Sequence, residues 1–303
     1  MGPSTSKDKG SEQHEKEYGL FSLHTESSHK PDIDVPPHCI DIVAIHGITG
    51  DAHETWTHAN GKLWLRDFVP QNLPGARVFT FGYPGDVFRS LNSFDNWARQ
   101  LLKDLTNVRT GKEKGRPLIF VCHSMGGIVL KKALTTARLG NYDDISSAVE
   151  GIMFFATPHR GSDSASLSVL LKTIGELATT LSKRGGTFRG DLFQDMEKDA
   201  KVLAQISKDF RNQLKGIKIA TFYEQRAIEI VPFSTPTLIV DEESAVMSVA
   251  GERLIPMAGC DHMSICRFSR ENGNSYALVW GVLQECAEDA RNSHVMVSDD
   301  DAT

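Results

Sequence analysis

A serine stands where a strand pattern meets a helix pattern, in the stretch PLIFVCHSMGGIVLKKAL. The apolar run before Ser124 is typical of a strand that is buried on both faces, and the residues after it have helical spacing. Gly126 and Gly127 follow, although each glycine costs a helix about 1 kcal/mol relative to alanine. The junction therefore predicts a nucleophile elbow, a sharp strand-to-helix turn that exposes a serine hydroxyl.

The positions two before and two after this serine must be small, because strand and helix pass close together there. They are Cys122 and Gly126. The usual pattern is G-x-S-x-G, so Cys122 is a departure from it. Because cysteine is also a small residue, we expect the packing to accommodate it.

Strand and helix patterns alternate around this junction. Strand-like runs occupy residues 39–47, 76–83, 117–123, 151–158, 216–224 and 252–259, and helical spacing marks 93–105, 126–139 and 276–286. Such alternation predicts an α/β fold with a mostly parallel sheet and helices on both faces. Residues 162–215 interrupt it with helical and polar, glycine-containing sequence, which predicts a helical insertion and a candidate lid.

The expected domain covers residues 38–290 of the 303, which is ample length for a core. Residues 1–37 are polar with few apolar anchors, so we expect a flexible tail there. Residues 291–303 end in SDDDAT and predict a short acidic tail.

Composition excludes several classes of function. The formal net charge of −6 gives no indication of a nucleic-acid partner. No apolar run reaches the roughly 18 residues of a membrane span, and the N-terminus lacks the apolar region of a signal peptide. The five cysteines are scattered without a CxxC pair, so we expect no metal, no cofactor and a reducing compartment, hence an intracellular, cytoplasmic protein.

The N-terminus matches the myristoylation pattern M-G-x-x-x-[ST] through Gly2 and Ser6. Residues left over from cloning would explain the same letters equally well. Acylation of Gly2 is therefore one of two open explanations.

A serine hydroxyl is a weak nucleophile and needs donors for the oxyanion that forms when it attacks. One donor is expected to be the backbone N–H of Met125, at the start of the helix. The second is expected from the loop after the first strand, HGITGD, where Gly47 permits a tight turn and Ile48 presents its N–H.

The general base should be a histidine late in the chain, because serine, acid and histidine follow in that order on such folds. His262 comes directly after the strand pattern 252–259, whereas His294 lies in the expected tail. For the acid, Glu224 ends a strand pattern directly and Asp241 follows a later apolar run. We prefer Glu224, with Asp241 as the alternative.

Seven stretches resemble those of α/β-hydrolases: VAIHGITGDAHETWT, WLRDFVP, ARVFTFGYPG, FVCHSMGGIVLKKAL, GIMFFATPHRG, IVDEESAVM and DHMSICRF. The sequence more closely resembles a eukaryotic lipase-like group that includes the serine-active-site-containing protein and the GPI inositol-deacylase. It also resembles the lipase-like domains at the front of fungal NOD-like immune proteins. The resemblance covers about residues 40 to 285 and implies an α/β-hydrolase fold, with Ser124 as nucleophile and His262 as base. It also suggests lipid metabolism and peripheral contact with mitochondrial or endoplasmic reticulum membranes.

These residues favour a serine esterase or lipase that cleaves a small-molecule or lipid ester through an acyl-enzyme. The apolar helix expected over residues 166–181 would help to bind an acyl chain. An acyltransferase or thioesterase would use the same triad, because the sequence does not report whether water reaches the acyl-enzyme. A non-catalytic signalling or binding domain on the same fold is the alternative from another class.

Overall fold

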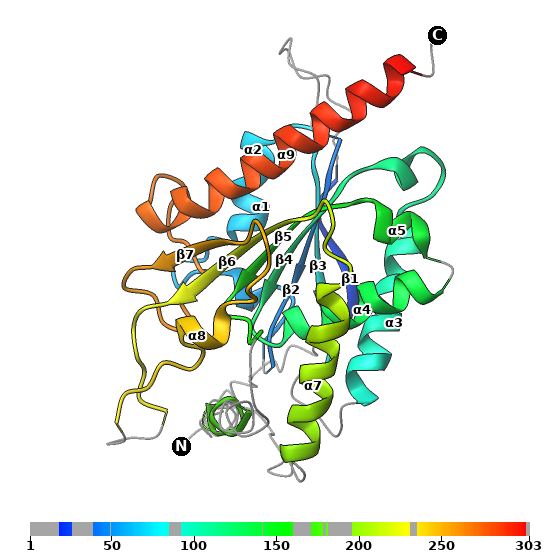
Figure 1. Cartoon of the computed structure of the whole chain (residues 1–303). Helices are drawn as coiled ribbons and strands as arrows, with labels where there is room; N and C mark the ends of the chain where they lie inside the picture. The colour runs from blue at the N-terminus through cyan, green and yellow to red at the C-terminus, as the bar shows by residue number, and fades with distance from the viewer. Residues whose placement is uncertain are drawn as a thin grey trace, which may run out of the picture.

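The structure is a computed structural model that describes residues 18–25, 39–48, 50–84, 92–140, 142–159, 171–177, 180, 196–230 and 235–300. Within this part of the chain, seven strands form one sheet in the order β1-β3-β2-β4-β5-β6-β7 (Figure 1). The strands are β1 (Gly19–His24), β2 (Asp41–Ile45), β3 (Arg77–Gly82), β4 (Leu118–His123), β5 (Val149–Phe155), β6 (Lys218–Glu224) and β7 (Arg253–Met257). β1 pairs antiparallel with β3, and the other neighbours are parallel.

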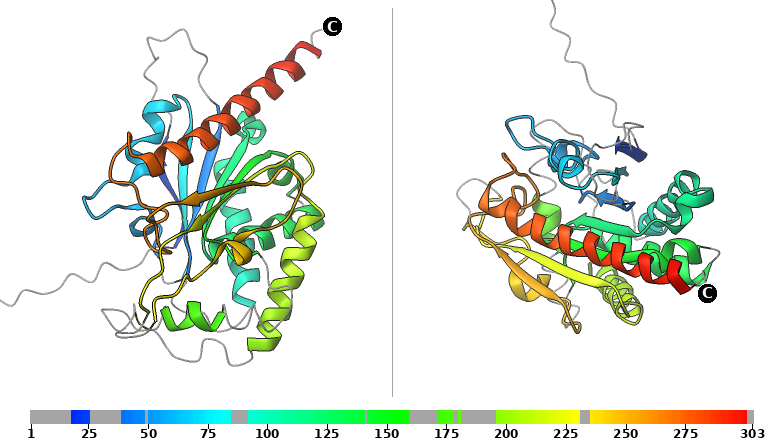
Figure 2. Two further views of the ribbon diagram at one scale, coloured as in Figure 1. Left: turned by 60° about the vertical axis from the view of Figure 1, so that its left-hand side comes forward. Right: turned by 90° about the horizontal axis from the view of Figure 1, so that it is seen from above.

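Helices cover both faces of the sheet. The helices are α1 (Trp64–Asp67), α2 (Val69–Asn72), α3 (Asn92–Val108), α4 (Gly126–Leu139), α5 (Asp143–Ser147), α7 (Met196–Arg211), α8 (Glu242–Ala245) and α9 (Asn274–Asp300), and residues 171–177 are also helical. α3, α4 and α7 lie on one face, and α1, α2 and α9 on the other (Figures 1 and 2). This architecture confirms the expected α/β-hydrolase fold.

The core is centred on the middle strands, because they are covered from both sides. Every residue of β2 and β4 is buried, as their near-continuous apolar sequences predict. α3 places Phe94, Trp97 and Leu101 against this core at helical spacing. No helix among the described residues is long and apolar enough to cross a membrane.

The N-terminal end of β2 is fixed by a buried ion cluster. Asp41 is fully buried, and its carboxylate accepts hydrogen bonds from Arg77, Arg109 and Arg116 at 2.5 to 2.8 Å. A buried carboxylate is tolerated when it is paired and hydrogen-bonded in this way. The cluster ties β2 and β3 to the segment between α3 and β4, on the side of the sheet away from the elbow.

Three boundaries differ from the sequence predictions. β1 lies within residues 1–37, where we expected only a tail; GLFSLH is a short apolar run whose polar flanks hid it. α9 continues to Asp300, past residue 290 where we expected the domain to end, because neither glycine nor proline interrupts the sequence there. α3 spans Asn92–Val108, so it begins one residue before the expected stretch 93–105 and ends three residues after it.

The expected insertion at residues 162–215 is described in part. α7 packs against α4, and its buried residues include Leu203 and Phe210. Residues 171–177 form a further helical stretch, so the helix expected over 166–181 is described only in part. Residues 162–170, 178–179 and 181–195 lie outside the described residues, as do residues 1–17 with Gly2.

The start of α4 passes unusually close to the end of β2. A Cβ built on Gly126 would overlap the carbonyl oxygens of Ile45 and His46, which are backbone atoms and have little freedom to move. Cys122, two residues before Ser124, is fully buried within β4. The small residues required by the elbow are therefore accommodated, with cysteine in the position where glycine is usual.

Gly126→Ala should destabilise the fold by about 1–3 kcal/mol, because the added methyl group must displace the backbone of β2. The measurement is the free energy of unfolding in urea. Gly281→Ala is the matched control, since Gly281 lies within α9 and a Cβ there meets nothing within 4 Å. That control should gain about 0.5–1 kcal/mol from helix propensity. Equal stability of the two variants would contradict the close approach.

Candidate active site

Ser124 occupies the turn between β4 and α4 in a strained conformation. Its φ of 51° lies in the left-handed region, which residues other than glycine seldom adopt. Its backbone N–H donates to the carbonyl of Phe155 at 2.8 Å, which anchors the turn to β5. Strain of this kind persists where the surrounding structure enforces it, and it is common at functional sites.

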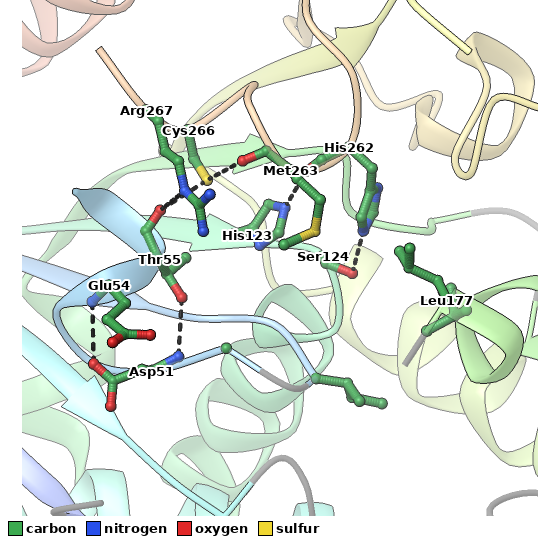
Figure 3. Close-up of a pocket in the computed structure, with 13 residues that line it drawn as sticks. Asp51, Glu54, Thr55, His123, Ser124, Leu177, His262, Met263, Cys266 and Arg267 are labelled. Carbon is green, nitrogen blue, oxygen red and sulfur yellow. Dashed lines mark hydrogen bonds between the residues drawn. The ribbon is translucent and has the colours of Figure 1, made fainter. Parts of the chain in front are cut away.

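His262 follows β7 in the chain and meets the serine in space. Its Nε2 lies 3.0 Å from Ser124 Oγ, and its Nδ1 lies 3.2 Å from Oε1 of Glu224 (Figure 3 shows the serine contact). All three side chains are buried. A hydroxyl, an imidazole and a carboxylate are thus hydrogen-bonded in sequence, the arrangement that activates a serine nucleophile.

Glu224 is the last residue of β6, and a second hydrogen bond, besides the one with His262, holds its carboxylate in place. Oε1 also accepts the backbone N–H of Val240 at 2.5 Å, whereas Oε2 has no hydrogen-bond partner among the described residues. The carboxylate is therefore oriented with one oxygen directed to the histidine.

Asp241, the alternative acid, has a different position. It is exposed and caps the short helix α8, accepting the backbone N–H of Ser244 at 2.9 Å. Of the two carboxylates considered from the sequence, Glu224 is the one that the fold brings to His262.

Both predicted oxyanion donors lie next to Ser124. Met125 is the N-cap of α4, and Ile48 lines the same pocket as the serine. The loop carrying Ile48 runs close to the nucleophile, since a Cβ on Gly47 would come within 2.8 Å of Ser124 Cβ. Neither amide nitrogen of Ile48 and Met125 donates a hydrogen bond to another residue that the structure describes.

The pocket around Ser124 has an apolar side and a polar side (Figure 3). Its apolar lining comes from Ile48, Ile174, Leu177 and Met263, and its polar lining includes Asp51, Glu54, Thr55 and Arg267. Partial burial opposes ionisation of Asp51, but hydrogen bonds from the backbone N–H groups of His53 and Glu54 lower the pKa of its carboxyl overall. Arg267 donates from Nε to the carbonyl of Thr55 at 3.2 Å. The pocket therefore offers charged groups and an apolar wall to one ligand.

His123 is a residue of this pocket that sequence reasoning did not single out. Its Nε2 lies 2.8 Å from the backbone carbonyl oxygen of His262. The ring N–H therefore donates a hydrogen bond to this oxygen and supports the loop that carries His262. Burial, together with the neighbouring His262, holds the pKa of His123 well below its usual value. Its position directly before the serine was the available signal, although adjacency alone does not reveal this long-range hydrogen bond.

A buried amine lies on α4 behind the elbow. Lys131 is fully buried, donates to Ser207 Oγ of α7 at 3.0 Å and lies 5.9 Å from the centre of the Phe154 ring. No described carboxylate pairs with it within 4 Å. Burial, and secondarily the positive charge of Arg211, lowers the pKa of Lys131 to about 7.

His159, from the TPHRG stretch, lies close to this amine. It contacts Phe154 edge-on at 4.4 Å between ring centres, and neither ring nitrogen has a hydrogen-bond partner among the described residues. Burial and the nearby Lys131 hold the pKa of His159 well below its usual value. Arg160 lies outside the described residues.

Comparisons with known proteins place the chain in a protein family and relate its fold to solved structures. A sequence model of the family described as "Putative serine esterase (DUF676)" matches residues 40–240, about two thirds of the chain. The protein SERAC1 of Danio rerio is 23% identical over 88% of this chain, and that of Homo sapiens is 22% identical over 94%. The chain spans 41% and 44% of the length of these two relatives.

Among solved structures, the mature lipase BlEst2 of Bacillus licheniformis is similar in fold. The TM-score is 0.55 with 18% sequence identity, and the match covers 88% of this chain and 97% of the lipase. At this identity the likeness concerns the fold alone, and it supports the same assignment of a mostly parallel sheet with helices on both faces.

Lys131 should make stability depend on pH above neutrality. Its pKa is about 7 in the folded state and about 10.5 in the unfolded state, so between these values the unfolded chain binds more protons. The free energy of unfolding is therefore highest, as far as Lys131 determines it, above about pH 10.5. It decreases as pH falls toward 7, because the unfolded chain is stabilised by protonation of this amine. Lys131→Met should be more stable than the wild type at pH 7.5. That advantage should shrink by about 1.4 kcal/mol per pH unit up to pH 9.5.

The measurement is urea unfolding of both proteins at pH 7.5, 8.5 and 9.5. Both proteins contain the same cysteines, so the titration of their thiols cancels when the two free energies of unfolding are subtracted. Lys132→Met is the matched control, because Lys132 is a neighbour on α4 that is partly exposed and paired with Asp95. Its difference from the wild type should not change with pH in this range. The same slope in both variants would show that Lys131 is not the group responsible.

Proposed function

The chain belongs to the family described as "Putative serine esterase (DUF676)" and has the α/β-hydrolase fold, and we propose that it cleaves carboxylic esters through an acyl-enzyme on Ser124. The observation that carries the proposal is the hydrogen-bonded series from Ser124 through His262 to Glu224. A cap or turn role for Ser124 alone would not require a buried imidazole and carboxylate aligned behind it.

In the proposed reaction, Ser124 Oγ attacks the carbonyl carbon of the ester while His262 Nε2 accepts the hydroxyl proton. Glu224 holds the Nδ1–H of the ring and stabilises the imidazolium that forms. The backbone N–H groups of Ile48 and Met125 bind the negatively charged oxygen of the tetrahedral intermediate. His262 then protonates the departing alcohol, and a water molecule hydrolyses the acyl-enzyme by the same steps.

The lining of the pocket suggests how an ester would lie. Ile174 and Leu177, from the helical stretch 171–177, offer a surface for an acyl chain, and Asp51, Glu54 and Arg267 offer polar contacts to the alcohol part. A small-molecule or lipid ester has both parts. Contact with membranes, and the compartment in which the protein acts, stay predictions from the family resemblance.

A fluorophosphonate probe tests the proposal directly, because it labels serines that are activated as nucleophiles. Wild-type protein should be labelled and should hydrolyse p-nitrophenyl esters, whereas Ser124→Ala should do neither while unfolding at a similar urea concentration. Ser264→Ala, a serine in the loop beside His262, should still be labelled. Folded wild-type protein that neither reacts with the probe nor hydrolyses any ester would favour a binding domain instead.

Glu224→Gln and Asp241→Asn separate the two candidate acids. Loss of the carboxylate behind a catalytic histidine lowers kcat by up to about 10⁴-fold in other serine hydrolases. We expect a loss of at least about 100-fold for Glu224→Gln and less than about ten-fold for Asp241→Asn, measured as steady-state kcat on one ester. Similar losses in both variants would mean that Glu224 is not the orienting acid.

A further inference from the structure

Tyr83 makes three contacts with one residue, His46, in the loop after β2. The phenol of Tyr83 donates to the carbonyl oxygen of His46 at 2.7 Å, and its backbone N–H donates to Nε2 of the same histidine at 3.1 Å. The two rings stack with centres 4.2 Å apart and planes 7° from parallel. Tyr83 is 2% exposed and packs on Trp97 of α3, so it is itself held in place.

These bonds determine which nitrogen of His46 carries the proton. Because Nε2 accepts the N–H of Tyr83, the proton of the neutral ring is on Nδ1. Nδ1 lies 2.7 Å from the carbonyl oxygen of Gly47 and therefore donates to it. The same oxygen accepts the backbone N–H of Gly50 at 3.1 Å.

The carbonyl of Gly47 and the N–H of Ile48 belong to one peptide unit. This unit is planar, and in the trans form the N–H points opposite to the C=O. Two donors on the Gly47 oxygen consequently fix the direction of the Ile48 N–H. Glycines at positions 47 and 50 leave the loop backbone free to rotate, so the side chains around it must supply this restraint.

We infer that Tyr83 and His46 are positioning residues that aim the N–H of Ile48 at the oxyanion of the reaction. The inference rests on the proposed function, because it concerns the transition state of ester cleavage. The start of α4 confines the same loop from the other side, where Gly126 passes against the carbonyls of Ile45 and His46. The loop is thus held between the phenol of Tyr83 and the helix that follows the nucleophile, and its donor is pre-organised before substrate binds.

Tyr83→Phe tests this by removing one hydroxyl and leaving the ring stack. Removal of a whole oxyanion donor costs about 10²–10³-fold in kcat, so misdirecting one should cost about ten-fold or more, with KM changed less than about two-fold. Tyr276→Phe is the matched control, because the Tyr276 hydroxyl is also buried but has no hydrogen-bond partner among the described residues. The control should keep wild-type kcat.

A comparison of an ester with its thionoester separates positioning from a general loss of stability. Sulfur in place of the carbonyl oxygen weakens hydrogen bonds to the oxyanion, so the wild type should favour the oxygen ester strongly. Tyr83→Phe should reduce this preference about as much as it reduces kcat. His46→Phe, which keeps the stack and removes both ring nitrogens, should behave in the same way.

The outcomes distinguish the two proposals. Turnover that depends on Ser124 but is unchanged in Tyr83→Phe would overturn the inference alone. A fall in kcat with an unchanged oxygen-to-sulfur preference would also overturn it, since the tyrosine would then act only on stability. Turnover that does not depend on Ser124 would overturn the proposed function and this inference together.

Discussion

The close approach of the start of α4 to the end of β2 is the constraint on which the site depends. Gly126 has room for no Cβ against the carbonyls of Ile45 and His46, so the backbone turns there within a few residues. Two residues earlier, Ser124 adopts a left-handed conformation with φ of 51°. The same proximity brings the loop after β2 beside the serine, so one packing contact places both the nucleophile and its proposed oxyanion donors.

The other members of the site come to this point because the carboxyl ends of parallel strands share one edge of the sheet. Ser124 follows β4, Glu224 ends β6, and His262 lies in the loop after β7. The neighbouring segments add support through hydrogen bonds, from the Val240 N–H to Glu224 and from His123 to the His262 carbonyl. Opposite this edge, the arginines around Asp41 fix the other end of β2.

The buried polar groups behind the elbow are shifted by burial toward their neutral forms. Lys131 and His159 lie against Phe154 with few hydrogen-bond partners, and burial shifts the pKa of each downward, toward the neutral form. A charged amine in this position would be costly to bury without a carboxylate. α4 thus carries the nucleophile turn at one end and a group sensitive to pH along its length, where α7 packs.

The sequence by itself determined the alternation of strands and helices, the strand–serine–glycine junction and the late histidine, because these depend on local spacing and on chain order. It did not determine β1, since six residues with polar flanks gain their stability from pairing with β3. It also left Glu224 and Asp241 as alternatives, because both follow apolar runs. Only the tertiary structure showed that Glu224 contacts His262 and that Asp241 caps a helix. Only it brought Tyr83, which follows β3, to His46, which follows β2. Contacts between distant segments depend on how the sheet is assembled, which local sequence patterns do not encode.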